Sequence, residues 1–275
     1  MSAAIRSNGL RSSGSRSSPS FTEASAASLA QQIDAELRRH RNPARAVAEK
    51  AYLKSDLDFL GVGLPAMRAV LRSIKQQHRL NRPGLIQLTT LLWDRPLFEW
   101  RMMAVLLLDA FESLLGRSDI ALLERLIRQS KTWAFVDELS IAVTGRLVER
   151  WAGLVDDLDR WSVDDDFWIR RAALLALLPQ LRRGAGDFER FGRYADRMLD
   201  EREFFIRKAI GWVLRETGKK QPDLVYAWLL PRCARASGVT VREAVKYLAP
   251  YQRIALLAAY AAAPPPKRAS GHALQ

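Results

Sequence analysis

Residues 167–172 read Phe-Trp-Ile-Arg-Arg-Ala, and the pattern returns as Phe-Phe-Ile-Arg-Lys-Ala at residues 204–209. A weaker copy, Val-Thr-Val-Arg-Glu-Ala, follows at residues 239–244, so that the copies lie 37 and 35 residues apart. A unit of this length holds two helices, which cannot cover their own apolar face and must stack on the next unit. The sequence therefore predicts an all-α fold, a curved solenoid of two-helix repeats whose inner helices line a concave groove.

The rest of the chain has the same helical periodicity, with apolar residues at spacings of three and four. We expect helices at residues 24–40, 43–54, 65–78, 85–93, 97–115, 118–129, 133–151, 166–182, 187–200, 203–217, 222–234, 240–248 and 250–262. Asn42 and Pro43 suit the cap and the first position of a helix, and Gly218 suits a left-handed residue after one.

A single helical domain is expected over residues 23–263. It is flanked by residues 1–22, rich in Ser and Arg, and by residues 264–275, which open with three prolines. Both compositions predict tails without a packed core.

The net charge of +13 is carried mainly by the expected domain. Five cations belong to the acid-free tails, so that +8 remains for residues 23–263. This balance favours a nucleic acid as partner and predicts a basic concave face.

The sequence contains no run of 18 apolar residues, which a membrane-spanning helix would need, and no membrane partner is expected. The lone Cys233 excludes an internal disulfide and favours a reducing compartment, so that we expect a cytoplasmic protein. The Arg- and Ser-rich start also resembles an organelle transit peptide, although no amphipathic apolar face accompanies its arginines. His40, His78 and His272 are scattered, so that neither a metal site nor a cofactor is expected.

A tryptophan lies on the polar side of the helix expected at residues 203–217. At 100° per residue, Lys208, Trp212 and Arg215 share a face opposite the apolar one. An indole framed by cations suggests a surface that meets something flat and anionic. The alternative is that Trp212 packs on a neighbouring helix beside two snorkelling cations.

A second aromatic residue leaves the core in the helix expected at residues 133–150. Trp133, Asp137, Ser140 and Thr144 form one stripe, away from the apolar side. The plain alternative for Asp137 is a surface acid near a helix N-terminus, where the helix dipole favours it by about 0.3–1 kcal/mol. Arg171 lies on a helix that is apolar nearly all round, so it needs a carboxylate or a phosphate as partner.

The chain resembles the DNA alkylation repair glycosylases of the AlkD type, which are right-handed superhelical solenoids of HEAT-like repeats. The likeness runs from about residue 43 to residue 248. The segments that carry it are Tyr52-Leu53-Lys54 with residues 59–62, Leu92-Trp93-Asp94 with Pro96 and Glu99, residues 131–137, residues 168–173, residues 203–216, and residues 242–244 with Lys246.

This resemblance implies roles for individual residues. Trp133 and Asp137 match the aromatic residue and the acid that the family keeps at the damaged nucleotide, and Trp212 matches its second aromatic residue. Arg171 matches an arginine on the phosphate side, and Tyr52 a tyrosine that closes the site. The implied substrate is a purine alkylated at a ring nitrogen, such as 3-methyladenine or 7-methylguanine, which stays stacked in duplex DNA while its glycosidic bond is hydrolysed.

The residue types suit that reaction. Because an alkylated purine already carries positive charge, it leaves without a general acid, and one carboxylate, Asp137, can stabilise the oxocarbenium-like sugar. The faces of Trp133 and Trp212 can stabilise the same cation. The residues that we expect to contact DNA are Arg171, Tyr52, Lys208, Arg215, Arg170 and Arg207.

Two other functions fit the pattern. Thr132 and Ala134 stand where the family often has a second tryptophan and an extra acid, which affects the rate or range expected of an enzyme. A non-catalytic solenoid that binds distorted or branched DNA is the main alternative to a monofunctional, monomeric glycosylase. A protein-binding scaffold is the third, and the +8 domain disfavours it.

Overall fold

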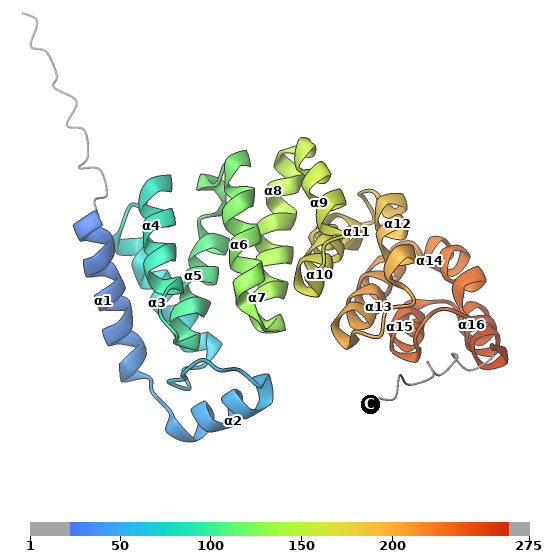
Figure 1. Cartoon of the computed structure of the whole chain (residues 1–275), viewed down its shortest axis with the longest axis horizontal. Coiled ribbons are helices and arrows are strands. Elements are labelled where there is room, and N and C mark those ends of the chain that lie inside the picture. Colours follow the sequence, from blue (N-terminus) through green and yellow to red (C-terminus); the bar gives the residue numbers. More distant parts are fainter. Residues whose placement is uncertain (1–22, 264–275) are drawn as a thin grey trace, which may run out of the picture.

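The structure is a computed structural model of the chain, and it describes residues 23–263. Its helices follow one another along a curved array, from α1 at the left of Figure 1 to α16 at the right. The array bends so that α2 and the last helices reach toward the same side. The expected all-α repeat fold is confirmed. The tails at residues 1–22 and 264–275 lie outside the described residues, and the single domain stays a prediction.

The α-helices are α1 (Glu23–Arg39), α2 (Pro43–Leu53), α3 (Leu64–Gln77), α4 (Arg82–Trp93), α5 (Phe98–Ala110), α6 (Ile120–Ser130), α7 (Trp133–Glu138), α8 (Gly145–Arg150), α9 (Val155–Trp161), α10 (Phe167–Ala176), α11 (Leu178–Arg182), α12 (Phe188–Met198), α13 (Phe204–Gly218), α14 (Pro222–Leu229), α15 (Gly238–Ala244) and α16 (Pro250–Ala262). Short 3-10 turns are formed by η1 (Glu112–Leu114), η2 (Arg117–Asp119), η4 (Ala152–Leu154), η5 (Leu230–Arg232) and η6 (Val245–Tyr247), and η3 (Leu139–Thr144) is a π-helical segment.

Ion pairs join equivalent positions of neighbouring repeats. Arg128 pairs with Asp164 at 2.5 Å, and these residues are 36 positions apart. Lys208 pairs with Glu243 at 2.7 Å across 35 positions. Because the sequence copies are 37 and 35 residues apart, these contacts have the period of the repeat and hold each repeat against the next.

Helix α10 is the centre of the array. It buries eight of its ten residues, Arg171 among them, and packs against α6, α7, α9 and α13. Each buried leucine contributes about 1.5–3 kcal/mol. The apolar composition of this segment thus explains why a polar side chain on it must find its partner inside the protein.

Helix α2 is held by its ends, because none of its residues is buried. The loop that follows it is fixed by Glu99, which is fully buried at the start of α5 and accepts hydrogen bonds of 2.7–3.0 Å from the backbone N–H groups of residues 60–62. Gly61 in this loop has φ +78°, and a Cβ there would lie 2.1 Å from the carbonyl oxygen of Asn42. Glu99 and Gly61 therefore set where α2 lies.

The helix expected at residues 133–151 is interrupted. It comprises α7, the π-helical segment at residues 139–144, and α8. The π-helical hydrogen bonds add a residue to the turn, so that the positions after Leu139 face other directions than a continuous α-helix predicts. The expected segments also missed α9, which comes after α8.

The left-handed residues are not where the sequence predicts them. Asn42 caps α2 as expected, since its side chain accepts from the backbone N–H of Arg45. Gly218, however, is the last residue of α13 and has no positive φ. Among the described residues other than glycine, positive φ occurs at Lys54 and Lys131, both with φ 49°. Each costs about 1–2 kcal/mol, because the Cβ crowds the following carbonyl oxygen.

Candidate nucleic-acid interface and catalytic site

Asp137 and Arg171 form a bidentate ion pair between α7 and α10. Nε of Arg171 donates to Oδ1 of Asp137 at 2.7 Å, and a terminal nitrogen donates to Oδ2 at 2.8 Å. The remaining terminal nitrogen donates to the carbonyl oxygen of Phe205 on α13. Arg171 is only 2% exposed, whereas the side chain of Asp137 is 17% exposed. The carboxylate therefore reaches the surface, held from behind by the arginine.

This geometry gives Arg171 protein partners, and the phosphate-side role that the resemblance implies stays a prediction. All three guanidinium nitrogens of Arg171 donate to Asp137 or to Phe205, and the residue is buried. The guanidinium is therefore not exposed for contact with DNA in this structure. Of the two partners that the sequence left open, Arg171 has the carboxylate. Its two hydrogen bonds hold both oxygens of Asp137.

Asp137 lines a cleft of about 380 Å³ between α2, α3, α5 and α7, which Trp212 reaches from α13. The predicted residues Tyr52, Trp133, Asp137 and Trp212 all line it. Its apolar wall consists of Leu53, Val62, Leu64, Met67, Phe98, Met102, Leu106 and Ala134, and its other charged residues are Arg45, Glu49, Arg68 and Glu138. The tertiary structure thus brings residues of several repeats to one cavity.

Two aromatic rings meet at the cleft. Tyr52 is 73% exposed and lies edge-on to Trp133, with ring centroids 6.2 Å apart and planes at 88°. Trp133 and Trp212 are half-buried and also pack against the apolar core. The alternative reading of Trp212 as a packing residue is therefore correct for part of its surface, while another part faces the cleft.

Ser140 and Thr144 do not share this surface. Both are fully buried, and the hydroxyl of Ser140 donates to the carbonyl oxygen of Val136 at 2.5 Å. The stripe expected at residues 133–150 is wrong beyond Asp137, because the π-helical segment turns the following residues into the core.

The cations expected to bind DNA have protein partners. Arg170 pairs with Glu201 at 2.7 Å, and Arg207 donates to the carbonyl oxygen of the same glutamate at 2.6 Å. Lys208 and Arg215 share a second glutamate, Glu243, on α15. None of these cations lines the cleft. Their contact with DNA remains a prediction, and in this structure each of them has a protein partner.

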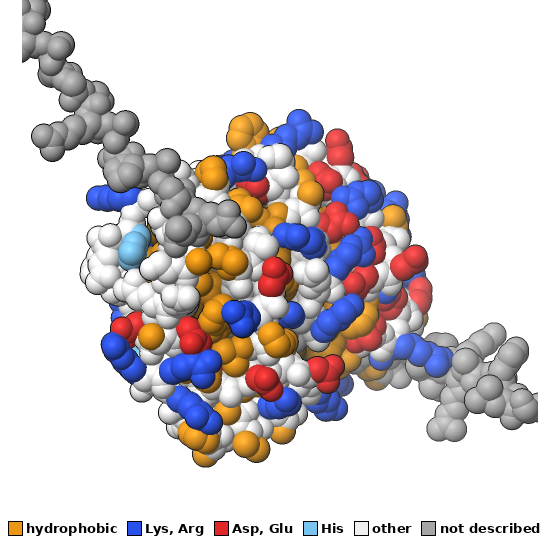
Figure 2. Space-filling view, turned by 60° about the vertical axis from the view of Figure 1, so that its left-hand side comes forward, with side chains coloured by type: hydrophobic (Ala, Val, Ile, Leu, Met, Phe, Trp, Pro, Cys, Tyr) orange, Lys and Arg blue, Asp and Glu red, His pale blue; other side chains and the backbone are white. Residues whose placement is uncertain are grey.

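Glu243 is the shared acidic partner of Lys208 and Arg215 on α13. Burial would raise its pKa, but hydrogen bonds from Lys208 and Lys246 and the charges of Arg215 and Lys208 outweigh burial and lower the pKa to about 2. Positive and negative side chains are likewise interleaved on the face shown in Figure 2, with hydrophobic side chains between them. This face is therefore not uniformly basic, and the basic concave face stays a prediction.

Four charged residues of the cleft were not predicted from the sequence: Arg45, Glu49, Arg68 and Glu138. Arg45 and Glu49 share the face of α2 that carries Tyr52, and their spacings of four and three residues are the signal that could have found them. Glu138 adjoins Asp137 and also lines the cleft. Its side chain forms no hydrogen bond or ion pair with residues 23–263.

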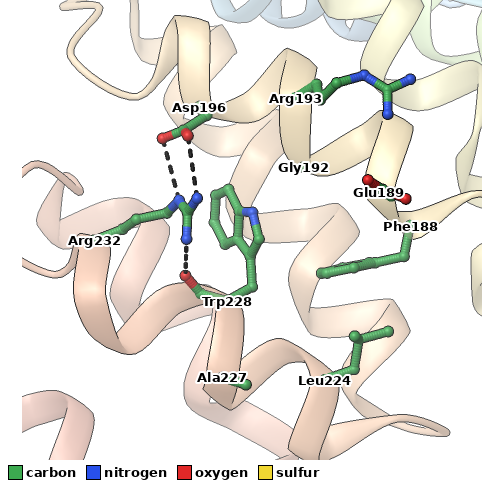
Figure 3. Close-up of a pocket in the computed structure, with 9 residues that line it drawn as sticks. All are labelled: Phe188, Glu189, Gly192, Arg193, Asp196, Leu224, Ala227, Trp228 and Arg232. Atoms are coloured by element: carbon green, nitrogen blue, oxygen red, sulfur yellow. Dashed lines mark hydrogen bonds and ion pairs between the residues drawn. The ribbon is translucent and has the colours of Figure 1, made fainter.

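A second cavity, of about 430 Å³, lies between α12 and α14 (Figure 3). Arg232 pairs there with Asp196 at 3.2 Å and lies over the ring of Trp228. No residue predicted for the site lines this cavity. The cleft beside Asp137 is therefore the candidate site.

Residues 23–263 contain neither a metal-binding cluster nor a membrane-spanning helix. No group of three or more His, Cys, Asp or Glu side chains in this part of the chain could hold a metal ion. None of its helices combines the length and the apolar character that crossing a membrane requires.

Residues 33–248 match the model of a protein family described as DNA alkylation repair enzyme. The chain belongs to this family. The matched residues include α2, α7, α10 and α13, which together carry every residue predicted for the site. Membership agrees with the resemblance read from the sequence, and DNA is the partner that the family suggests.

Solved structures show the same fold for this family member. It is similar to a predicted DNA alkylation repair enzyme from Enterococcus faecalis, with a TM-score of 0.68, 24% identity, and coverage of 77% of this chain and 98% of the other. It is also similar to AlkD2 from Streptococcus mutans, with a TM-score of 0.54, 18% identity, and coverage of 74% and 99%. The comparison with curated proteins gives no match. At these identities the likeness establishes the helical-repeat fold alone.

Proposed function

We propose that this protein is a monofunctional DNA glycosylase of base excision repair. It hydrolyses the N-glycosidic bond of cationic alkylated purines, of the 3-methyladenine or 7-methylguanine type, in duplex DNA. The observation that carries the proposal is the carboxylate of Asp137, which Arg171 orients from the buried side and which opens on a cleft with Tyr52, Trp133 and Trp212.

The chemistry needs little from the protein beyond a placed negative charge. An alkylated purine is a cation and leaves as a neutral base, so the developing positive charge lies on the sugar. Asp137 stabilises that charge and orients the attacking water. Because the two hydrogen bonds from Arg171 fix the carboxylate, no reorganisation of this side chain is needed at the moment of reaction.

The aromatic residues contribute through their electron-rich faces. Trp133 and Trp212 both line the cleft, and a cation over such a ring gains about 0.5–2 kcal/mol, depending on how far it is desolvated. Tyr52 is mostly exposed and edge-on to Trp133, so it covers one side of the bound nucleotide. A neutral purine gains no comparable stabilisation, which makes charge the basis of selectivity.

Glu138 adds to this selectivity. Arg171 already compensates the charge of Asp137, whereas Glu138 lines the same cleft without a partner among the described residues. An uncompensated carboxylate close to the lesion attracts a cationic base and not a neutral one.

The protein binds duplex DNA along its backbone and acts alone. The damaged nucleotide stays in the helical stack, and Arg170, Arg207, Lys208 and Arg215 contact the backbone after exchanging protein partners for phosphates. The protein acts as a cytoplasmic monomer without a cofactor.

Base release from methylated duplex DNA tests the proposal. The wild type is expected to release methylated purine above the spontaneous rate, and Asp137→Asn to release it about 100-fold more slowly. Because the substitution leaves Arg171 without its carboxylate, the unfolding midpoint and the affinity for duplex DNA are measured on the same samples. Absence of release by the folded wild type rejects the glycosylase.

The ion pair also favours a second candidate function. A carboxylate bound by both oxygens has the geometry of a structural link between α7 and α10, which suits a non-catalytic solenoid that binds distorted or branched DNA. In that case the wild type binds duplex DNA in a salt-dependent manner, and neither it nor Asp137→Asn releases a base.

A further inference from the structure

Lys54 and Lys131 share an unusual backbone. Both have φ 49°, and among the described residues other than glycine no further residue has positive φ. Each is the C-cap of its helix, Lys54 of α2 and Lys131 of α6. Glycine or asparagine is the usual residue at such a position, so a lysine there costs folding stability that a simple substitution would recover.

The two side chains are exposed and free. Neither lysine forms a hydrogen bond or an ion pair through its side chain within residues 23–263. The lysine and arginines predicted to bind DNA on α10 and α13 differ in this respect, because each has a carboxylate or carbonyl partner. The ammonium groups of Lys54 and Lys131 therefore keep their full charge for an external anion.

Their location links them to the cleft. Lys54 is two residues after Tyr52, and Lys131 is two residues before Trp133. These two rings contact each other edge-on and line the cleft beside Asp137. Since consecutive Cα atoms are about 3.8 Å apart, each lysine lies within about 8 Å of its aromatic neighbour along the backbone. Two free cations from different repeats thus lie two residues along the chain from the two rings of one aromatic pair.

We propose that Lys54 and Lys131 are phosphate-binding residues that hold the DNA backbone on either side of the nucleotide at Trp133. The left-handed backbone at each helix end is retained because the position needs a cation, at the expense of stability. The inference rests on the proposed function only in taking duplex DNA as the ligand.

The test uses Lys54→Asn and Lys131→Asn, since asparagine tolerates the left-handed conformation and removes the charge. The affinity for an undamaged DNA duplex is measured between 50 and 200 mM salt, together with the denaturant midpoint of unfolding. Because a lysine that neutralises one phosphate contributes about 0.9 to the slope of log affinity against log salt, each variant is expected to lose about one unit of slope. Each is also expected to unfold at the same or a higher denaturant concentration.

Lys220→Asn is the matched control. Lys220 is exposed, forms no side-chain ion pair within the described part of the chain, and lies after α13, in the C-terminal half of the array. Its variant is expected to keep the slope of the wild type. The proposal is overturned if Lys54→Asn and Lys131→Asn keep that slope as well, or if the wild type does not bind duplex DNA. A fall in the denaturant midpoint would overturn the explanation of the left-handed lysines.

The outcome is distinct from that of the proposed function. If the wild type binds DNA with the predicted dependence on Lys54 and Lys131 but releases no methylated base, the phosphate-binding role of the lysines is supported and the glycosylase activity is rejected. If the wild type releases methylated base but the lysine variants keep the wild-type slope, the glycosylase activity is supported and the phosphate-binding role of the lysines is rejected.

Discussion

Arg171 and Asp137 are 34 positions apart and meet through two parallel hydrogen bonds of 2.7 and 2.8 Å. The arginine lies inside the protein, and the carboxylate lies at the edge of the cleft. A buried charge that loses its partner destabilises a protein by about 3–5 kcal/mol. The pair therefore couples the stability of the central repeats to the orientation of the proposed catalytic acid.

Arg171→Lys separates these two contributions. Lysine keeps the positive charge but cannot donate two parallel hydrogen bonds, so we expect a folded protein whose base release falls at least tenfold while its affinity for DNA changes little. The control is Arg128→Lys, which breaks a similar bidentate pair with Asp164 away from the cleft. Equal rate losses in the two variants would contradict a positioning role for Arg171.

Glu138→Gln tests the selectivity for cationic bases. Removing an uncompensated carboxylate from the cleft is expected to cost about 1 kcal/mol of transition-state stabilisation, or about fivefold in the release of 7-methylguanine. Glu189→Gln in the second cavity makes the same chemical change away from the cleft and should leave the rate unchanged. If both variants match the wild type, Glu138 has no part in recognition.

Trp133→Leu tests the aromatic contribution. Leucine retains an apolar side chain but removes the ring that faces the cleft, so base release is expected to fall by about 3–30-fold, corresponding to the loss of a cation–π contact. Trp151, which is 45% exposed and does not line the cleft, provides the control substitution Trp151→Leu. A Trp133 variant with the wild-type rate would show that the indole only packs.

Glu243 predicts a specific pH dependence of stability. Its pKa is lowered from 4.5 to about 2 in the folded protein. Its carboxylate therefore stabilises the fold fully above pH 4.5, and this contribution, on the order of 2–3 kcal/mol, is lost as the pH falls from about 4.5 toward 2. Glu243→Gln should be less stable than the wild type by that amount at pH 7, and the difference should vanish near pH 2.

Denaturant unfolding at several pH values measures this difference. Glu149→Gln removes one partner of the exposed ion pair with Arg183 and should change stability by no more than about 1 kcal/mol at neutral pH. A Glu243 variant whose deficit does not depend on pH would contradict the assignment.

Much of the fold could be predicted from local pattern. The copies at residues 167–172 and 204–209 indicated the repeat, and the period returns in ion pairs such as that of Lys208 with Glu243. The apolar segment around Arg171 indicated a buried helix, and α10 is the most central one. These features follow from periodicity, which is a property of neighbouring residues.

The π-helical segment could not be predicted in this way. Residues 139–144 lie inside a segment whose apolar spacing is that of a continuous α-helix, whereas the structure has a π-helical turn there and buries Ser140 and Thr144. A helical wheel drawn at 100° per residue therefore predicts correctly that Asp137 faces away from the core, but it wrongly places Ser140 and Thr144 on the same surface.

The sequence by itself determined that this chain is a helical repeat protein of the DNA alkylation repair family, and it singled out Tyr52, Trp133, Asp137 and Trp212. Only the tertiary structure decided that these residues line one cleft, that Arg171 faces Asp137 rather than solvent, and which cations stay free. The physical reason is that periodicity acts over a few residues, whereas the partner of a charge is chosen between repeats more than 30 positions apart, where burial makes pairing obligatory.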